Sequence, residues 1–199
     1  MSEKHRNYFN EKAPIWDQLM SHRDLQQIAN IIKELGIQEG STILDVGTGT
    51  GIVLPFLKEE VGPRGKIVAF DIAEEMLQLA REKNGDEIIE YIEGDLTATS
   101  FAEHTFDVIL CYSCFPHMLD KEAVAREMMR ILKPLGRTII CHSSSREELN
   151  HMHQSIGGAV GNDMLPDNET MNYIFQKAGF IEITITERDN EYVLTGIKP

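Results

Sequence analysis

The chain has 199 residues, of which 42% are hydrophobic, enough to fill the core of one domain. Its 32 acidic against 19 basic residues give a formal net charge of −13, which repels polyanions and argues against DNA or RNA as a partner. No apolar run is long enough to cross a membrane, and the first residues lack the apolar stretch of a signal peptide. We therefore expect a single domain over residues 1–199, located in the cytoplasm without membrane insertion, that acts on a small molecule; composition leaves its oligomeric state open.

The first predicted core element is a helix. Its apolar residues recur at intervals of three and four and predict one buried face that ends near Gly36. These residues are Leu25, Ile28, Ala29, Ile32 and Leu35.

The most informative segment is a glycine turn after the first predicted strand, residues 43–46. Asp45 lies near the end of this strand, and Gly47, Gly49 and Gly51 follow before a helix starts. Glycines allow a sharp turn and a close ligand approach, while the helix start offers free N–H groups. The dinucleotide fingerprint needs its third glycine three residues after the second, but here the interval is two. The turn therefore favours a nucleoside ligand without phosphates over a pyrophosphate.

Strands and helices then alternate, which predicts a parallel sheet covered on both faces. We expect further strands at 66–71, 90–95, 106–111 and 137–142, and helices at 52–60, 73–83, 120–132 and 168–178. Residues 181–186 and 192–197 flank a turn at Asp189 and Asn190 and predict an antiparallel hairpin at one edge. The expected fold class is α/β: a doubly wound, mostly parallel, seven-stranded Rossmann-like sheet with a C-terminal antiparallel hairpin.

Carboxylates occur at three consecutive strand ends. Asp45 belongs to the first strand, Asp71 ends the second and Asp95 ends the third. An acid at the tip of the second strand is placed to accept hydrogen bonds from two ribose hydroxyls. The three acids together support a nucleoside site.

On these residues the chain resembles the class I S-adenosyl-L-methionine (SAM) dependent methyltransferases, in particular the small quinone-biosynthesis-type methylases of the methyltransferase type 11 group. The resemblance covers nearly the whole chain. It rests on Asp45, Gly47, Gly49, Gly51, Asp71, Gly94, Asp95, Phe106, Asp107 and residues 132–136.

The resemblance implies SAM as the cofactor and assigns its contacts. Asp45 would orient the amino group, Asp71 would hold the ribose, and Asp95 would accept from the adenine amino group. The glycine turn would pass under the methionine part. The implied cofactor-binding residues are Asp45, Gly47, Thr48, Gly49, Gly51, Asp71, Ile72, Met76, Asp95, Leu96, Cys111 and Tyr112. Met76 has a simple alternative, because a methionine at helical spacing is often a core residue.

Two segments lie outside the strand and helix alternation. The resemblance implies a lid in the N-terminal segment, which we place at residues 1–22. Residues 143–166 are long for a strand-to-helix link and predict a cap over the active face. If the cap begins as a helix, Arg146, Asn150 and His153 share one face. With Ser113, they are the expected substrate-binding residues.

His117 and His142 follow adjacent predicted strands and are the expected catalytic residues. Either could remove a proton from the acceptor, although a histidine can also be a substrate contact, a metal ligand or polar filler. His117 matches a position where the family often carries a histidine. Cys111 and Cys114 have metal-ligand spacing, but no second pair exists, so we expect reduced, apolar thiols and no metal site.

The predicted function is SAM-dependent methyl transfer to a small-molecule acceptor. The acceptor atom stays open between oxygen, nitrogen, carbon, sulfur and a metalloid. The alternatives are a non-catalytic SAM- or metal-binding regulatory protein and, with less support, an NAD-type oxidoreductase, which the glycine spacing and Asp95 oppose.

Overall fold

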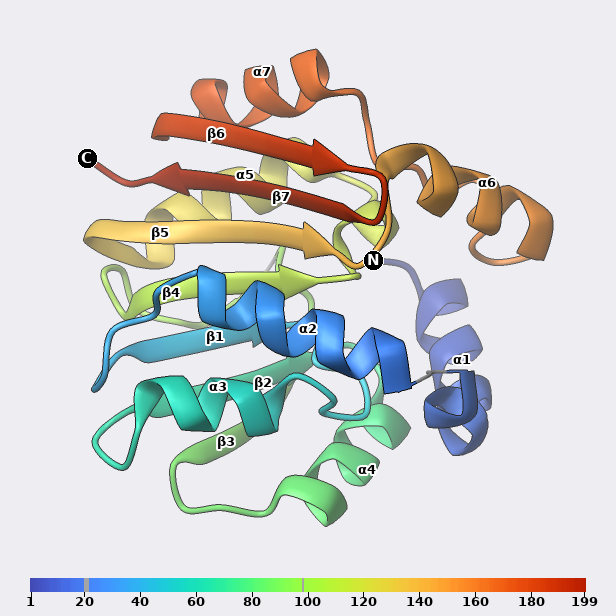
Figure 1. Cartoon of the computed structure of the whole chain (residues 1–199), viewed down its shortest axis with the longest axis horizontal. Coiled ribbons are helices and arrows are strands. Elements are labelled where there is room, and N and C mark those ends of the chain that lie inside the picture. Colours follow the sequence, from blue (N-terminus) through green and yellow to red (C-terminus); the bar gives the residue numbers. More distant parts are fainter. Residues whose placement is uncertain (20–21, 98) are drawn as a thin grey trace.

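A seven-stranded sheet forms the centre of the molecule, in the order β3-β2-β1-β4-β5-β7-β6 (Figure 1). The computed structural model describes residues 1–19, 22–97 and 99–199. Strands β1 to β5 pair in parallel, whereas β7 is antiparallel to both of its neighbours. The strands are β1 Thr42–Val46, β2 Lys66–Asp71, β3 Ile89–Glu93, β4 Phe106–Tyr112, β5 Leu132–His142, β6 Ile181–Arg188 and β7 Glu191–Ile197. The predicted fold class is confirmed.

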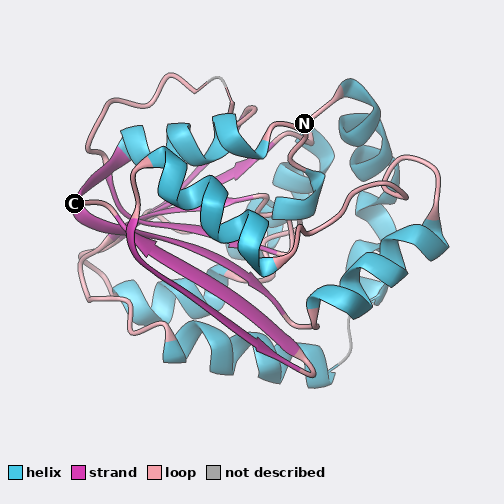
Figure 2. Ribbon diagram, turned by 90° about the horizontal axis from the view of Figure 1, so that it is seen from above, coloured by secondary structure: helices cyan, strands magenta, loops and turns pink. Residues whose placement is uncertain are grey.

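Helices cover both faces of this sheet, with α2 and α3 on one face and α5 and α7 on the other (Figures 1 and 2). Each predicted helix is present, with ends shifted by three residues or fewer. The α-helices are α1 Glu3–Lys12, α2 His22–Glu34, α3 Leu54–Val61, α4 Glu74–Asn84, α5 Lys121–Ile131, α6 Arg146–Ile156 and α7 Asn168–Ala178. Two 3₁₀ segments are η1 Ala13–Leu19 and η2 Phe115–His117.

The hydrophobic core has two main parts because successive residues of a strand point to opposite faces. In β1, Ile43 packs with residues of α2 and α3, while Leu44 packs with residues of α5 and α7. Both side chains are fully buried. A parallel sheet covered on both faces needs such continuous apolar strands.

The predicted hairpin is present, with Arg188 opposite Glu191 and only Asp189 and Asn190 between the strands. Most strand ends differ from the sequence prediction by no more than two residues, and two differences matter most. Strand β3 ends at Glu93, so Asp95 lies two residues beyond it, and β5 begins at Leu132 rather than at residue 137.

The N-terminal segment forms helix α1 and the 3₁₀ segment η1, which the sequence did not predict. The buried residues of α1 are only His5 and Phe9, so the segment lacks a long apolar stripe. The hydroxyl of Ser2 accepts from the His5 backbone N–H in a capping box that starts the helix. Phe9 and Ala13 pack with Ala73 and Met76. Of the expected lid, residues 20–21 lie outside the described part of the chain.

Helices α1 and α6 lie beyond the carboxyl ends of the parallel strands, where the arrows of β4 and β5 point (Figure 1). Helix α6 lies within the segment expected as a cap. Among the described residues, no helix is long and apolar enough to cross a membrane.

Candidate active site

At Gly47, the first glycine of the turn after β1, the backbone conformation and the surroundings exclude a side chain. Gly47 has φ +67°, and a Cβ atom there would lie 2.4 Å from Cβ of Cys114. The Gly47 and Thr48 N–H groups both donate to the Phe70 carbonyl, at 2.7 and 3.1 Å. The turn is thereby held against β2, with its backbone close to Cys114.

Asp45 is a buried carboxyl group that has no cationic partner among the described residues. It is 1% exposed, and its Oδ2 accepts a hydrogen bond of 2.6 Å from the Thr48 hydroxyl. Burial raises the pKa of Asp45 to about 7; the Thr48 hydrogen bond opposes this shift, and the nearby Asp71 carboxylate adds to it. A cation beside Asp45 would relieve the cost of ionising it.

Asp71 ends β2 and binds the backbone of two turns. Its Oδ2 accepts from the Gly49 N–H and its Oδ1 from the Ala73 N–H, both at 2.9 Å. Burial raises its pKa, and these backbone hydrogen bonds partly offset the rise. Since each carboxylate oxygen can accept more than one hydrogen bond, Asp71 retains capacity for further donors.

A small hollow of about 10 Å³ lies between the ends of β1 and β2. Asp95 lines it, and its Oδ2 accepts from the Met1 ammonium group at 2.6 Å. Burial opposes ionisation of Asp95, but hydrogen bonds from Met1 and Thr97 outweigh it and lower the pKa. The remaining lining residues are Met1, Val46, Gly47, Phe70, Asp71, Ile72, Gly94, Leu96 and Met118. The hollow thus gathers five of the predicted cofactor residues: Gly47, Asp71, Ile72, Asp95 and Leu96.

Three other predicted cofactor residues, Met76, Cys111 and Tyr112, do not line this hollow. Met76 is 1% exposed and packs with Phe9 and Ala73, as its core interpretation suggested. Cys111 is fully buried in the core on the α5 and α7 side. The Tyr112 hydroxyl lies 2.8 Å from the Ser143 hydroxyl, while Ser113 is exposed with φ +53°.

His117 belongs to a buried polar cluster at the carboxyl edge of the sheet. Its Nδ1 lies 2.8 Å from Oδ2 of Asp163, and His5 Nε2 lies 2.9 Å from the same oxygen. The ring centroid of His153 is 4.9 Å from that of His117. Burial lowers the pKa of His117, and the hydrogen bond that its ring donates to Asp163 partly restores it. His117 is therefore neutral at neutral pH.

His142, the second histidine predicted to be catalytic, lies deeper. It is fully buried, its ring packs edge-on against Tyr192, and neither ring nitrogen has a hydrogen-bond partner among the described residues. Burial lowers its pKa to about 3, and the neighbouring His117 and His153 add to the effect. The ring offers no exposed atom to an acceptor, whereas His117 keeps 7% of its surface exposed.

The predicted substrate-binding residues of the cap form contacts with protein groups, mainly within the cap. The Asn150 amide donates to the Leu165 carbonyl at 3.0 Å and accepts from the Leu165 N–H at 2.8 Å. His153 Nδ1 donates to the Asp163 carbonyl at 2.6 Å. Arg146 pairs with Glu187 at 3.9 Å. The three side chains therefore bind protein groups, and two of them fix residues 163–165 above the strand ends.

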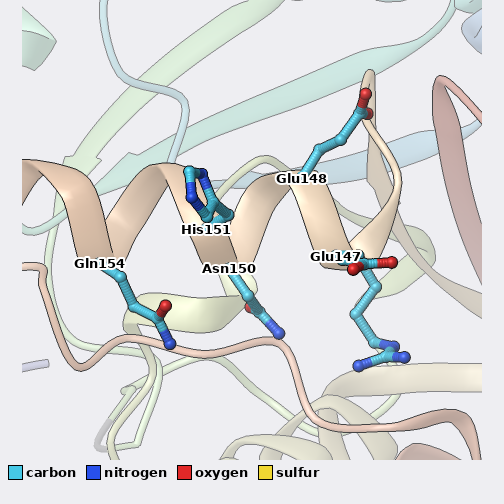
Figure 3. Close-up of a pocket in the computed structure, with 6 residues that line it drawn as sticks. Glu147, Glu148, Asn150, His151 and Gln154 are labelled. Atoms are coloured by element: carbon cyan, nitrogen blue, oxygen red, sulfur yellow. The ribbon is translucent and has the colours of Figure 1, made fainter.

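A second hollow is open to solvent and runs along α6 (Figure 3). Its lining comes from that helix alone: Arg146, Glu147, Glu148, Asn150, His151 and Gln154. A hollow formed by one helix brings together no groups from the strand ends, so we place the chemistry at the edge of the sheet instead.

Sequence reasoning missed two members of the histidine cluster. His5 lies in a segment interpreted only as an aromatic lid, and Asp163 lies 46 residues from its partner His117. Neither residue stands in a motif, so the sequence carried no signal that they meet.

Comparison with known proteins identifies the family. Residues 44–140 match the model of a methyltransferase domain. The ubiquinone/menaquinone biosynthesis C-methyltransferase UbiE of Escherichia coli is 34% identical over 171 residues, covering 73% of this chain and 68% of that protein.

Solved structures share the fold. A SAM-dependent methyltransferase from Aquifex aeolicus has a TM-score of 0.76 and 23% identity, covering 94% of this chain and 98% of its own. Phosphoethanolamine N-methyltransferase 2 of Haemonchus contortus, solved with SAM, has a TM-score of 0.73 and 19% identity, covering 87% and 52%. With the glycine turn and strand-end acids in place, the chain belongs to the class I SAM-dependent methyltransferases and uses SAM as its methyl donor.

Proposed function

We propose that this chain methylates a small-molecule acceptor that loses one proton in the reaction, and that His117 is the base that takes a proton from the acceptor. The observation that carries the proposal is the orientation of the His117 ring. Its Nδ1 is engaged by Asp163, and the described residues make no hydrogen bond to Nε2. A neutral imidazole with one nitrogen engaged by a carboxylate presents the other as a base.

The residues at the edge of the sheet fit the cofactor. The buried Asp45 carboxyl group, which no cation pairs with in the described part of the chain, suits the amino group of SAM. Asp95 already binds an ammonium group in the hollow, so it suits an amino donor such as that of adenine. The ribose would bind Asp71. We retain the whole predicted set as the proposed contacts, with Met76 and Cys111 acting through packing.

SAM, when bound, supplies a methyl group on a sulfonium that is already an activated leaving group. The chain therefore has to hold the acceptor in line and remove its proton. Phe9 of α1 packs edge-on against His117 at 5.1 Å between ring centroids. Helix α1 thus covers the base and would limit the access of water to it.

The acceptor class follows from the relative's chemistry. UbiE is named as a C-methyltransferase of ubiquinone and menaquinone biosynthesis. A ring carbon of a phenol or hydroquinone becomes nucleophilic when the hydroxyl is ionised, and a base such as His117 can take that proton. Once the methyl–carbon bond has formed, the carbon loses its hydrogen as a proton and the oxygen regains one, so the acceptor loses one proton in all. We propose a phenolic or hydroquinone acceptor, with Tyr112 and Ser113 near its polar groups and Arg146, Asn150 and His153 shaping its cavity through the cap.

The net charge of −13 favours a small molecule over a nucleic acid, and a cytoplasmic location fits the composition. The similarity to methyltransferases supports neither the regulatory nor the NAD-type alternative.

A panel of phenols, hydroquinones, amines and thiols incubated with methyl-labelled SAM tests this proposal. Transfer of label to a phenolic or hydroquinone acceptor by the wild type, with a loss of about 10²–10⁴ in turnover for His117→Ala, is the expected result. Transfer that survives in His117→Ala would refute the role of the base.

A further inference from the structure

Three segments that are distant in the sequence meet at one carboxylate oxygen. His5 comes from α1, His117 from η2, and Asp163 from the loop between α6 and α7. Oδ2 of Asp163 contacts both imidazoles, at 2.9 and 2.8 Å. The three side chains are 3%, 7% and 6% exposed. Because a buried carboxylate is costly unless it is hydrogen-bonded, this contact also stabilises the docked position of α1.

The proton positions follow from the partners of each ring. The backbone N–H of Ser2 donates to Nδ1 of His5 at 3.3 Å, so Nδ1 is an acceptor and Nε2 carries the hydrogen. His5 therefore donates to Asp163 through Nε2. A carboxylate only accepts, so Nδ1 of His117 must carry its hydrogen and Nε2 keeps a lone pair.

Asp163 is itself held in place by the cap. Its backbone carbonyl accepts from His153 Nδ1, and its neighbour Leu165 is bound from both sides by Asn150. Burial raises the pKa of Asp163, but the hydrogen bonds and electrostatic interactions with His117 and His5 outweigh this effect and lower the pKa. The oxygen that receives both rings is thus fixed and ionised.

We propose that Asp163 is the positioning residue of the base and that His5 couples it to the lid. Asp163 holds His117 in the tautomer with a free Nε2 and stabilises the imidazolium that forms when the proton is taken. His5 binds the same oxygen and so docks α1 beside it. His117 therefore adopts this tautomer when α1 is docked over the strand ends. This inference rests on the proposed role of His117.

The first experiment needs no acceptor. Nitrogen-15 NMR of the imidazoles in the whole chain reports the tautomer and pKa of His117. In the wild type, neutral His117 should be protonated at Nδ1. The titratable groups that act on it are Asp163, His5 of α1, His153 of α6 and His142 of β5, while Lys121 of α5 acts on Asp163.

Asp163→Asn should remove the single tautomer, because an amide can donate as well as accept, and should lower the pKa of His117, because the carboxylate raises it. Turnover on the acceptor found by the screen should fall by about 10²–10⁴. An unchanged tautomer and pKa would overturn the proposal. His151→Ala, an exposed histidine of the same helix α6, is the matched control.

His5 variants test the coupling if the Asp163 variant does not fold. His5→Ala should lower the amide-exchange protection of residues 3–12, and His5→Gln, whose amide can donate to Asp163, should restore part of it. Equal protection in all three chains would overturn the docking role.

Two experimental outcomes distinguish the positioning role of Asp163 from a metal centre and from failure of the proposed base. The ligand atoms of His5, His117 and Asp163 lie within 4.8 Å of one another, so the triad could bind a divalent metal. Stoichiometric Zn²⁺ uptake by the wild type that Asp163→Asn abolishes would replace the positioning role with a metal centre. If His117→Ala keeps full turnover while the tautomer of His117 in the otherwise unchanged chain depends on Asp163, then His117 is not the base. The contact of His5, His117 and Asp163 would then have a structural role only.

Discussion

The backbone N–H of Gly49 donates to Oδ2 of Asp71 at 2.9 Å, which ties the glycine turn after β1 to the tip of β2. One carboxylate therefore shapes the turn and, by our account, also holds the ribose. The two functions explain why the acid lies at the strand end, where both groups can reach it.

Asp71→Ala should weaken SAM binding by about 1.5–3 kcal/mol, the range for lost hydrogen bonds to a charged group. Asp71→Asn, which keeps one acceptor oxygen, should lose less. NAD should not bind either form, because the glycine spacing does not fit a pyrophosphate. Calorimetric titration decides; equal affinity of wild type and Asp71→Ala would mean that the ribose is bound elsewhere.

The raised pKa of Asp45 predicts that a proton is released when SAM binds. Its carboxyl group is partly protonated near pH 7 in the free protein, and the ammonium group of SAM favours the ionised form. SAM affinity should therefore rise between pH 5 and about 7. Titrations in two buffers of different ionisation enthalpy at pH 6.5 measure the released proton.

In Asp45→Asn the proton release on SAM binding should disappear.

The raised pKa of Asp45 also has a consequence for the stability of the folded protein. The folded carboxyl binds its proton more tightly than the unfolded one, so the free energy of unfolding of the unliganded protein should fall as pH rises from about 4 to about 7. Asp45→Asn should flatten this decline, and an unchanged slope would contradict the assignment.

Gly47→Ala tests the close approach of the turn to Cys114. The added Cβ would lie 2.4 Å from Cβ of Cys114, and φ +67° disfavours a side chain. We expect a loss of about 1–3 kcal/mol in the free energy of unfolding and a strong loss of SAM binding. Gly36→Ala is the matched control, because Gly36 has φ +57° but open space around it. Similar losses in both variants, measured by urea unfolding, would assign the effect to backbone strain alone.

Much of the fold could be predicted because local signals agreed with it. Apolar runs marked β1 and β2, and Gly179 marked the end of α7 in a left-handed conformation. The acids at strand ends could be placed because parallel strands share one edge. Helix α1 was missed because only two of its residues are buried, which leaves little periodicity.

The histidine cluster shows where sequence reasoning ends. His117 and His142 follow adjacent strands, yet one borders the edge and the other is enclosed by Tyr192. The alternation of side chains along a strand does not indicate which of the two histidine rings a later hairpin will cover. His5 and Asp163 reach His117 through packing of α1 and α6, and no local pattern encodes that packing.

The N-terminal segment should respond to the cofactor. Asp17 of η1 binds the Thr50 hydroxyl and Lys83, and Trp16 Nε1 lies 4.0 Å from where a Cβ of Gly49 would be. Saturating S-adenosylhomocysteine should change Trp16 fluorescence and protect residues 3–17 from amide exchange. Asp17→Ala should reduce both effects. A spectrum and exchange pattern indifferent to the ligand would place this segment outside the site.

The most direct test of the account measures label transfer from methyl-labelled SAM to phenolic and hydroquinone acceptors by wild type and His117→Ala, with S-adenosylhomocysteine affinity measured in parallel. We predict transfer by the wild type, a fall of about 10²–10⁴ in turnover for His117→Ala, and nearly equal affinity for S-adenosylhomocysteine. Equal turnover of the two proteins on the same acceptor would contradict the account.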